Sequence, residues 1–263
     1  MKKLVIALTA LAAFTGSAVA ADLGARPYAK APAPMAAYNW TGFYIFGGGG
    51  GGLWSADTTV QSTATGACIL CTNQRQGGDG WFGTVGAGYD WQVGPTWLIG
   101  VFGDGQFGSI KGTIQDQVPF VAGSIKMETA WAAGARVGML IAPNVLSYVN
   151  GGYTGSDWSG TSLVSTINGA PAGTHTNGFS RNGWFVGGGV ENNLNFFGIN
   201  APGWFMKTEY RTAFYDRKAI NELVDGTNAL VGRDITFKPW VQTISTSLVY
   251  RFNWGGAPVQ ARY

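Results

Sequence analysis

Eight segments of the chain alternate apolar and polar residues with a period of two, which is the spacing of a β-strand with a different environment on each face. In residues 81–93, for example, Trp81, Tyr89 and Trp91 fall on one face, and Thr84 and Asp90 fall on the other. The pattern predicts an all-β chain of antiparallel strands. The segments that carry it are 40–54, 81–93, 97–111, 126–141, 145–158, 182–194, 204–216 and 240–252.

The connections between these segments alternate in length. Residues 55–80, 112–125, 159–181 and 217–239 are long and rich in Gly, Ser, Thr, Asn and Asp, and are predicted to be polar loops. Residues 94–96 and 142–144 are short turns, and 195–203 is a somewhat longer link. Long loops at one end and short turns at the other are typical of bacterial outer-membrane barrels. An even number of strands then places both termini on the periplasmic side.

The outward faces decide between a membrane barrel and a soluble one, because both show a period of two. Charged residues make up 12% of the chain, about half the usual 25%, and no uncharged apolar stretch of the mature chain is long enough for a helical span. Aromatic residues stand at the ends of the apolar faces, as interfacial girdles require: Trp81, Trp91, Trp204, Phe214, Trp240 and Phe252. These features predict an eight-stranded antiparallel up-and-down transmembrane β-barrel, with a secreted soluble barrel or sandwich as the alternative.

The N-terminus has the parts of a secretory signal. Lys2 and Lys3 precede an apolar run of about eleven residues, too short to span a bilayer as an anchor helix, and Ala18 and Ala20 stand at −3 and −1 of a cleavage site. Removing both lysines lowers the formal charge from +3 to +1, and no basic cluster remains for a nucleic acid. We predict a signal peptide at 1–20, an Ala/Pro-rich periplasmic leader at 21–39, the barrel at 40–252 and a periplasmic tail at 253–263.

The polar faces place nine charged residues inside the barrel. Charges in a narrow lumen must pair, because an isolated buried charge is costly, so we predict an ion-pair network that plugs it. Strand 204–216 facing the final strand is its expected centre. A gate or proton path is the functional alternative to structural packing. The predicted members are Asp90, Asp104, Glu128, Arg136, Glu191, Lys207, Glu209, Arg211 and Arg251.

Other motifs point away from catalysis and from metals. Cys68 and Cys71 form a C-x-x-C in an exported chain, which favours a small loop disulfide over a redox or zinc site. The single histidine, His175, lies in a predicted loop near Ser180, without a strand to preorganise a Ser–His pair. The glycine run 47–52 lacks the Lys-Ser/Thr of a phosphate loop and is expected to permit close packing instead. We therefore expect no enzyme, no cofactor and no metal.

Residues 21–23 and 30–34, followed by Tyr38–Tyr44, resemble the leader and first strand of the alphaproteobacterial outer-membrane immunogenic protein family, often called porin-family proteins. The resemblance implies an eight-stranded barrel similar to the transmembrane domain of OmpA, acting as an abundant surface antigen that contributes to envelope integrity. Residues 247–252 look like the terminal strand that the barrel-assembly machinery reads, with Tyr250 and Phe252 as its aromatics. The chain departs from many relatives by continuing to Tyr263.

The expected function is that of a structural surface protein of the cell outer membrane with a plugged lumen. A narrow diffusion pore is the first alternative, and an adhesin or receptor acting through loops 55–80 and 159–181 is the second. The expected partners are outer-membrane lipid, lipopolysaccharide and, during biogenesis, the assembly machinery.

Overall fold

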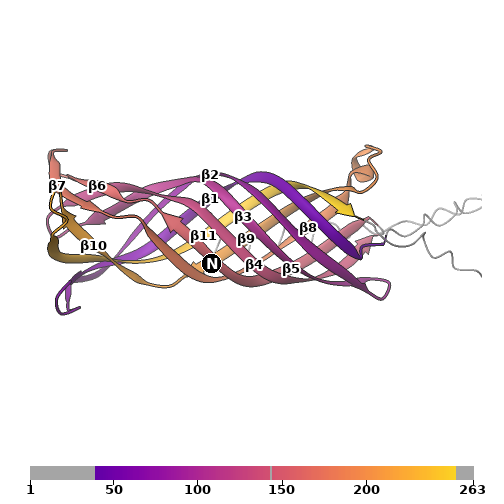
Figure 1. Ribbon diagram of the computed structural model, residues 1–263, viewed down its shortest axis with the longest axis horizontal. Coiled ribbons are helices and arrows are strands. Elements are labelled where there is room, and N and C mark those ends of the chain that lie inside the picture. The colour runs from indigo at the N-terminus through magenta and orange to yellow at the C-terminus, as the bar shows by residue number, and fades with distance from the viewer. Residues whose placement is uncertain (1–38, 143, 253–263) are drawn as a thin grey trace, which may run out of the picture. The chain divides into compact units, whose positions relative to one another are not determined.

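The computed structural model describes residues 39–142 and 144–252 (Figure 1). The predicted signal peptide, nearly all of the leader and the tail lie outside these ranges. Eleven strands and a short 3₁₀ helix, η2 (Leu194–Phe197), make up the described part. The strands are β1 (Gly42–Ser62), β2 (Cys68–Val93), β3 (Trp97–Asp116), β4 (Val121–Ala142), β5 (Val145–Trp158), β6 (Thr161–Ser165), β7 (Pro171–Thr176), β8 (Phe179–Asn193), β9 (Trp204–Tyr215), β10 (Lys218–Val224) and β11 (Leu230–Phe252).

Eight of these strands form a closed antiparallel barrel, which confirms the predicted fold class. The order around the ring is β1, β2, β3, β4, β5, β8, β9 and β11. The first and last strands pair from Phe43↔Phe252 to Ser62↔Arg233, so the sheet has no free edge there. A Cβ on Gly48 or Gly50 would collide with the backbone of β11, so the glycine run permits close approach at this seam. No helix in the described ranges is long and apolar enough to cross a membrane.

The predicted long loops are the main error of the sequence interpretation. Strands β1 to β4 and β11 continue well beyond their predicted ends, and β6, β7 and β10 prolong β5, β8 and β9. At this level β4 pairs with β6, β6 with β7, β7 with β10 and β10 with β11. Eight paired strands therefore surround this part of the barrel too. Their outer face is polar, as in a loop, but apolar side chains such as Val60, Ile114 and Ile235 are buried inside.

Outward aromatic residues divide the barrel into two regions. Exposed apolar side chains cover the wall between Trp81 and Trp91 on β2, which are ten residues apart. Ten residues span about 33 Å along a strand, or about 25 Å along the axis of a barrel with the usual tilt. This is the height of an outer-membrane apolar band. We call this region the apolar band, and the part beyond Trp81, Trp131, Trp184 and Trp240, which ends in the hairpins, the extension.

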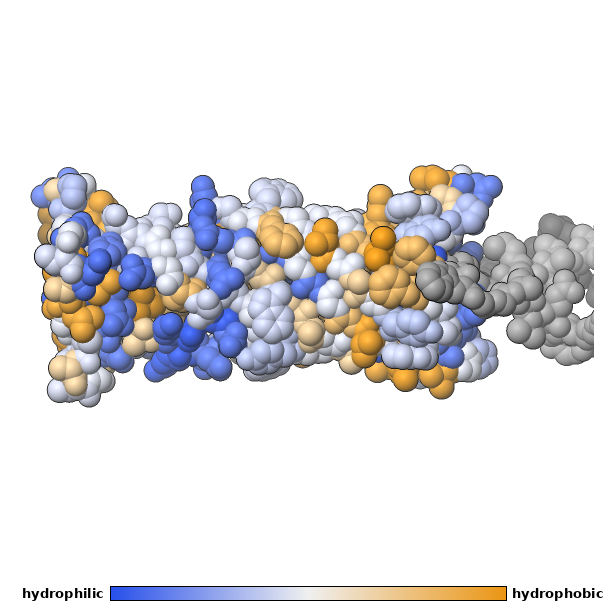
Figure 2. Space-filling view, viewed as in Figure 1, coloured by the Kyte–Doolittle hydropathy of each residue, from blue (hydrophilic) through white to orange (hydrophobic). Residues whose placement is uncertain are grey.

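Exposed charges mark the edge between the two regions. Asp79 and Lys238 each lie two residues beyond a tryptophan, Trp81 and Trp240. Every charged side chain of the described apolar band is buried, whereas charged side chains are exposed on the outer wall of the extension. Figure 2 shows hydrophilic side chains gathered toward the hairpin end of the visible face.

Candidate functional site: the charged interior of the barrel

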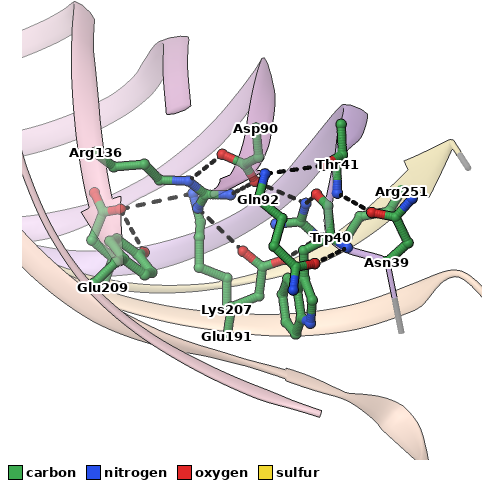
Figure 3. A network of polar contacts seen from close by, with 11 residues as sticks. Asn39, Trp40, Thr41, Asp90, Gln92, Arg136, Glu191, Lys207, Glu209 and Arg251 are labelled. Atoms are coloured by element: carbon green, nitrogen blue, oxygen red, sulfur yellow. Dashed lines mark hydrogen bonds and ion pairs between the residues drawn. The ribbon is translucent and has the colours of Figure 1, made fainter. Parts of the chain in front are cut away.

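Two arginines and two carboxylates from four strands form a closed ring in the lumen near the start of β1 and the end of β11 (Figure 3). Arg136 on β4 donates from Nε to Asp90 Oδ1 on β2 at 2.9 Å, and from Nη1 to Glu191 Oε2 on β8 at 3.2 Å. Arg251 on β11 lies between the same two acids, with Nε 2.7 Å from Glu191 Oε1 and Nη1 2.8 Å from Asp90 Oδ2. Each charge meets two of opposite sign, so the ring is neutral.

A second neutral cluster lies deeper in the barrel. Arg211 on β9 donates to both carboxylate oxygens of Asp104 on β3, at 3.0 and 2.8 Å, and to Glu209 Oε1 at 2.7 Å. The other oxygen of Glu209 accepts hydrogen bonds from Tyr148 Oη at 2.8 Å and Asn150 Nδ2 at 3.0 Å. Two acids and two bases are present again when Lys207, 3.9 Å from Glu209, is included.

Aromatic faces complete the surroundings of the cations. Lys207 Nζ lies 3.3 Å from the centroid of the Phe46 ring, and Arg136 lies 4.5 Å from that of Tyr44. A cation over a ring face is attracted by its quadrupole, most strongly where water is excluded. All eight charged residues of the two clusters are buried. The lumen is therefore filled by paired charges with aromatic side chains between them.

The structure corrects two details of the predicted network. Glu128 lies on the outside of the barrel, where it pairs with Lys126 at 2.9 Å. A register shift between Met127 and Thr129 reverses which residues face inward, so simple alternation placed Glu128 on the wrong face. The expected centre, β9 facing Arg251, is also wrong. The β9 ladder on β11 ends at Trp204↔Tyr250, so Arg251 lies beyond it and meets Asp90 and Glu191 instead.

Apolar side chains close the lumen on both sides of the charged clusters. Toward the start of β1, Trp40 and Phe205 are fully buried with their rings 4.9 Å apart, as are Leu98, Leu146 and Val249. Toward the hairpins, four aromatic rings pack with centroids 5.2–6.2 Å apart. We call these four, Trp54, Trp158, Phe179 and Phe237, the aromatic plug.

A small void adjoins the second charged cluster. It is lined by Arg211, Thr154 and Tyr215 and has a volume of about 10 Å³, which is about enough for one water molecule. A conducting pore needs a continuous hydrated path of polar walls. The lumen thus contains three consecutive layers, apolar, charged and aromatic.

Comparison with known proteins agrees with this architecture. The chain is 27% identical to the 31 kDa outer-membrane immunogenic proteins of Brucella melitensis and Brucella suis, over 263 residues that cover 96% of this chain and all of each relative. The chain is thus similar to these proteins along nearly its whole length. It is an outer-membrane β-barrel. No family model matches the sequence.

A solved structure supports the fold independently. The outer-membrane protein OprG of Pseudomonas aeruginosa aligns with a TM-score of 0.54 and 10% identity, covering 81% of this chain and 98% of OprG. At that identity the likeness concerns the arrangement of strands alone.

The extension contains a polar cluster that the sequence pattern did not predict. Arg233 on β11 lies 3.2 Å from Asp116 Oδ2 on β3 and 3.5 Å from Glu222 Oε2 on β10. Burial and the neighbouring Asp116 raise the pKa of Glu222 from 4.5 to about 8. Asp116, Glu222 and Arg233 lie in segments that were predicted to be loops. One signal for this cluster is present in the sequence. Glu222 is two positions from the apolar Ile220, and Arg233 is two positions from Ile235, which is the spacing of residues that share one face of a strand.

The remaining candidates lie apart from one another. Cys68 and Cys71 are joined by a disulfide at the start of β2. His175 lies on β7 and not in the predicted loop, and its Nδ1 is 2.7 Å from Asp225 Oδ1. Ser180 donates to Asp157, so the two residues have different partners. No group of three or more potential metal ligands occurs within the described ranges. Tyr250 and Phe252 end β11 with their rings 4.8 Å apart.

Proposed function

We propose that the protein is a structural barrel of the outer membrane whose lumen is sealed to solutes, and that it has no catalytic role. The observation that carries this proposal is the three-layer filling of the lumen. Ion pairs cross the lumen from β2 and from β8 to β4 and β11, and aromatic rings pack above them. A solute would have to break several buried charge pairs to pass, and each unpaired charge costs several kcal/mol.

We further propose that the extension faces the cell exterior and that both termini are periplasmic. The exposed charges of the described outer wall lie on the extension, where long hairpins also occur. Long hairpins on one side and short turns on the other follow the usual asymmetry of such barrels. An epitope inserted at Asn168, in the β6–β7 turn, should be detected on intact cells. Detection only after permeabilisation would reverse the orientation.

A liposome-swelling assay tests the sealed lumen. The mature protein is reconstituted after its folding is verified by the heat-dependent gel shift of intact barrels, and sugars of graded size are applied. We expect swelling rates equal to those of protein-free liposomes for all sugars. A size-dependent rate above that background would instead make the protein a narrow diffusion pore.

Surface binding through the hairpin tips is a second candidate, and one feature favours it. Val118, Phe120, Val164 and Ile167 are exposed apolar residues on two adjacent hairpins, which Thr166 links by donating from its backbone N to Phe120 O at 2.8 Å. Phe120 has a left-handed backbone, with φ of 56°, and such strain in a bulky residue often accompanies a binding role. Binding of labelled protein to host-cell surfaces should fall when Phe120 and Ile167 are replaced by serine. Unchanged binding would remove this candidate.

A further inference from the structure

The barrel wall is interrupted at one place in the extension. Three staves of the wall are each divided into two strands at a similar height along the barrel: β5 is followed by β6, β7 by β8, and β9 by β10. The ladder between β7 and β10 ends at Thr176↔Glu222, and that between β8 and β9 begins at Gly183↔Tyr215. One further backbone hydrogen bond, from Asp216 N to Asn182 O at 3.0 Å, extends the β8–β9 ladder. Among the described residues, no ladder pair joins 177–181 with 217–221. We call this gap the window.

The window holds a cavity of about 310 Å³ open to the outside. Phe179, Ile220 and Leu223 form its apolar lining, and Lys218 and Asn221 contribute polar groups. Phe179 also belongs to the aromatic plug, where its ring is 5.5 Å from that of Phe237. Phe179 is therefore shared by the window and the plug, so an occupant would be held in the wall, with the plug between it and the lumen below.

Two cations border the window from opposite sides. Arg181 lies two positions from the buried Phe179, and Lys218 lies two positions from the buried Ile220. Residues two apart on a strand share a face, so both cations occupy lumen-facing positions, yet both are partly exposed. Arg181 Nη1 donates to Arg217 O across the gap at 3.4 Å. Arg217 adds a third positive charge at the rim. Asp216 attracts Arg181, but among the described residues no carboxylate pairs with Arg181, Arg217 or Lys218 within 4.0 Å.

Other exposed cations of the extension already have acidic neighbours. Lys126 pairs with Glu128 at 2.9 Å and Arg75 with Asp57 at 3.6 Å, and Lys111 stands opposite Asp79 in the β2–β3 ladder. Three bases and one acid leave a net charge of +2 at the window. Backbone N–H groups on its unpaired edges are additional donors, and such groups together with arginine favour an anion.

The height of the window identifies the anion. It begins just beyond the stacked outward rings of Trp184, Phe214 and Trp240, and polar headgroups form a layer about 5–8 Å thick outside the hydrocarbon core. We propose that the window binds a phosphate group of lipopolysaccharide, with Arg181 and Lys218 as its ligands and the acyl chains lying over the aromatic rings below. The choice of lipid rests on the proposed orientation, because lipopolysaccharide occupies the outer leaflet.

Binding of fluorescent lipopolysaccharide to the refolded mature protein in detergent micelles tests the site. The double variant Arg181→Gln/Lys218→Gln should bind at least about tenfold more weakly, because each lost charge-assisted contact contributes appreciably. The control Lys111→Gln/Lys126→Gln removes the same charge from cations that have acidic neighbours, and should change affinity less than about twofold. Equal losses in both variants would mean that only overall charge matters, and would overturn the proposal.

Two further probes identify the ligand group. Enzymatically dephosphorylated lipopolysaccharide should bind the wild type as weakly as intact lipopolysaccharide binds the double variant. Inorganic phosphate at millimolar concentration should not displace the lipid. Displacement would assign the site to free phosphate, and indifference to dephosphorylation would assign it to an apolar or sugar ligand. The gel shift verifies folding, and Lys218→Gln alone replaces the double variant if that fails to fold. These assays measure no conductance, so they are independent of whether the lumen is sealed.

Discussion

The apolar band and the extension are built from the same barrel wall, yet their polarity is reversed. In the band the outer face carries Val85, Val137 and Trp131, and the interior carries charges such as Arg136 and Glu191. In the extension the outer face carries charges, and much of the interior is apolar and aromatic. The reversal occurs within single strands, as on β11, where Phe237 and Arg251 both face inward.

This difference shows that the medium outside the wall decides what the wall encloses. Apolar side chains of the band face the lipid, so its inward positions can carry paired charges. These charges are tolerated only while each has its partner, because an unpaired buried charge is costly. Water surrounds the extension, which must therefore be held together as a soluble barrel is, by burying apolar area. The two regions should respond in opposite ways to the loss of a charge and the loss of a ring.

Loss of one lumen charge should produce the largest effect. Arg136→Ala leaves Asp90 and Glu191 each without one partner in a water-poor interior, and is expected to lower the free energy of unfolding by about 3–5 kcal/mol. Urea unfolding in lipid vesicles measures this. The control Arg75→Ala breaks an exposed pair of the extension and should cost less than about 1 kcal/mol. Similar losses from both variants would contradict the contrast between the regions.

Loss of one ring of the aromatic plug should destabilise the extension by about 3 kcal/mol. Phe237→Ala removes a fully buried ring that packs against Trp54, Trp158 and Phe179. Hydrogen exchange should increase in β6, β7 and β10 while amides of the apolar band stay protected. The neighbouring Lys238→Ala, on the outer face, should leave both regions unchanged. Equal deprotection of the band would show that the two regions unfold as one unit.

The stability of the extension should fall as pH rises toward 8. The pKa of Glu222 is raised by burial and by Asp116 from 4.5 to about 8, so between these values the folded state holds a proton that the unfolded chain has lost. The free energy of unfolding therefore decreases as pH rises through this range. Glu222→Gln should abolish the decrease.

Pulse proteolysis of the extension in urea at pH 6 and pH 9 measures this difference. The advantage of Glu222→Gln over the wild type should grow by roughly 2 kcal/mol between the two pH values. Asp79→Asn, an exposed acid on the outer wall of the extension, is the control and should show no such trend. A pH-independent advantage would mean that Glu222 is ionised throughout.

The disulfide should have the smallest effect. Cys68 and Cys71 are three positions apart, and a ring this short removes little entropy from the unfolded chain, so Cys68→Ser/Cys71→Ser should cost less than about 2 kcal/mol. Proteolysis should increase only at the β1–β2 hairpin. Increased exchange in β3 or β4 would instead indicate that the disulfide supports the whole extension.

The sequence predicted the band better than the extension, for a physical reason. Eight strands and the inward positions of Asp90, Arg136 and Glu191 follow from strict alternation, which lipid imposes on the outer face. Beyond the aromatic residues water accepts any polar residue outside, so Gly- and Thr-rich strands could not be told from loops. Glu128 was misplaced by a bulge, which alternation cannot anticipate. Partners such as Tyr148 and Glu209, 61 positions apart, depend on the register and tilt of β5 and β9.

Single-channel recording in planar bilayers tests the sealed lumen most directly. The folded wild-type protein is compared with Trp158→Gly/Phe237→Gly, which opens the aromatic plug but keeps the ion pairs, and with Asp90→Ser/Arg136→Ser, which opens the charged ring but keeps the plug. Because the layers that remain in each variant still close the lumen, all three proteins should show no steady conductance. Reproducible channels from the folded wild type would contradict the account and make the protein a pore.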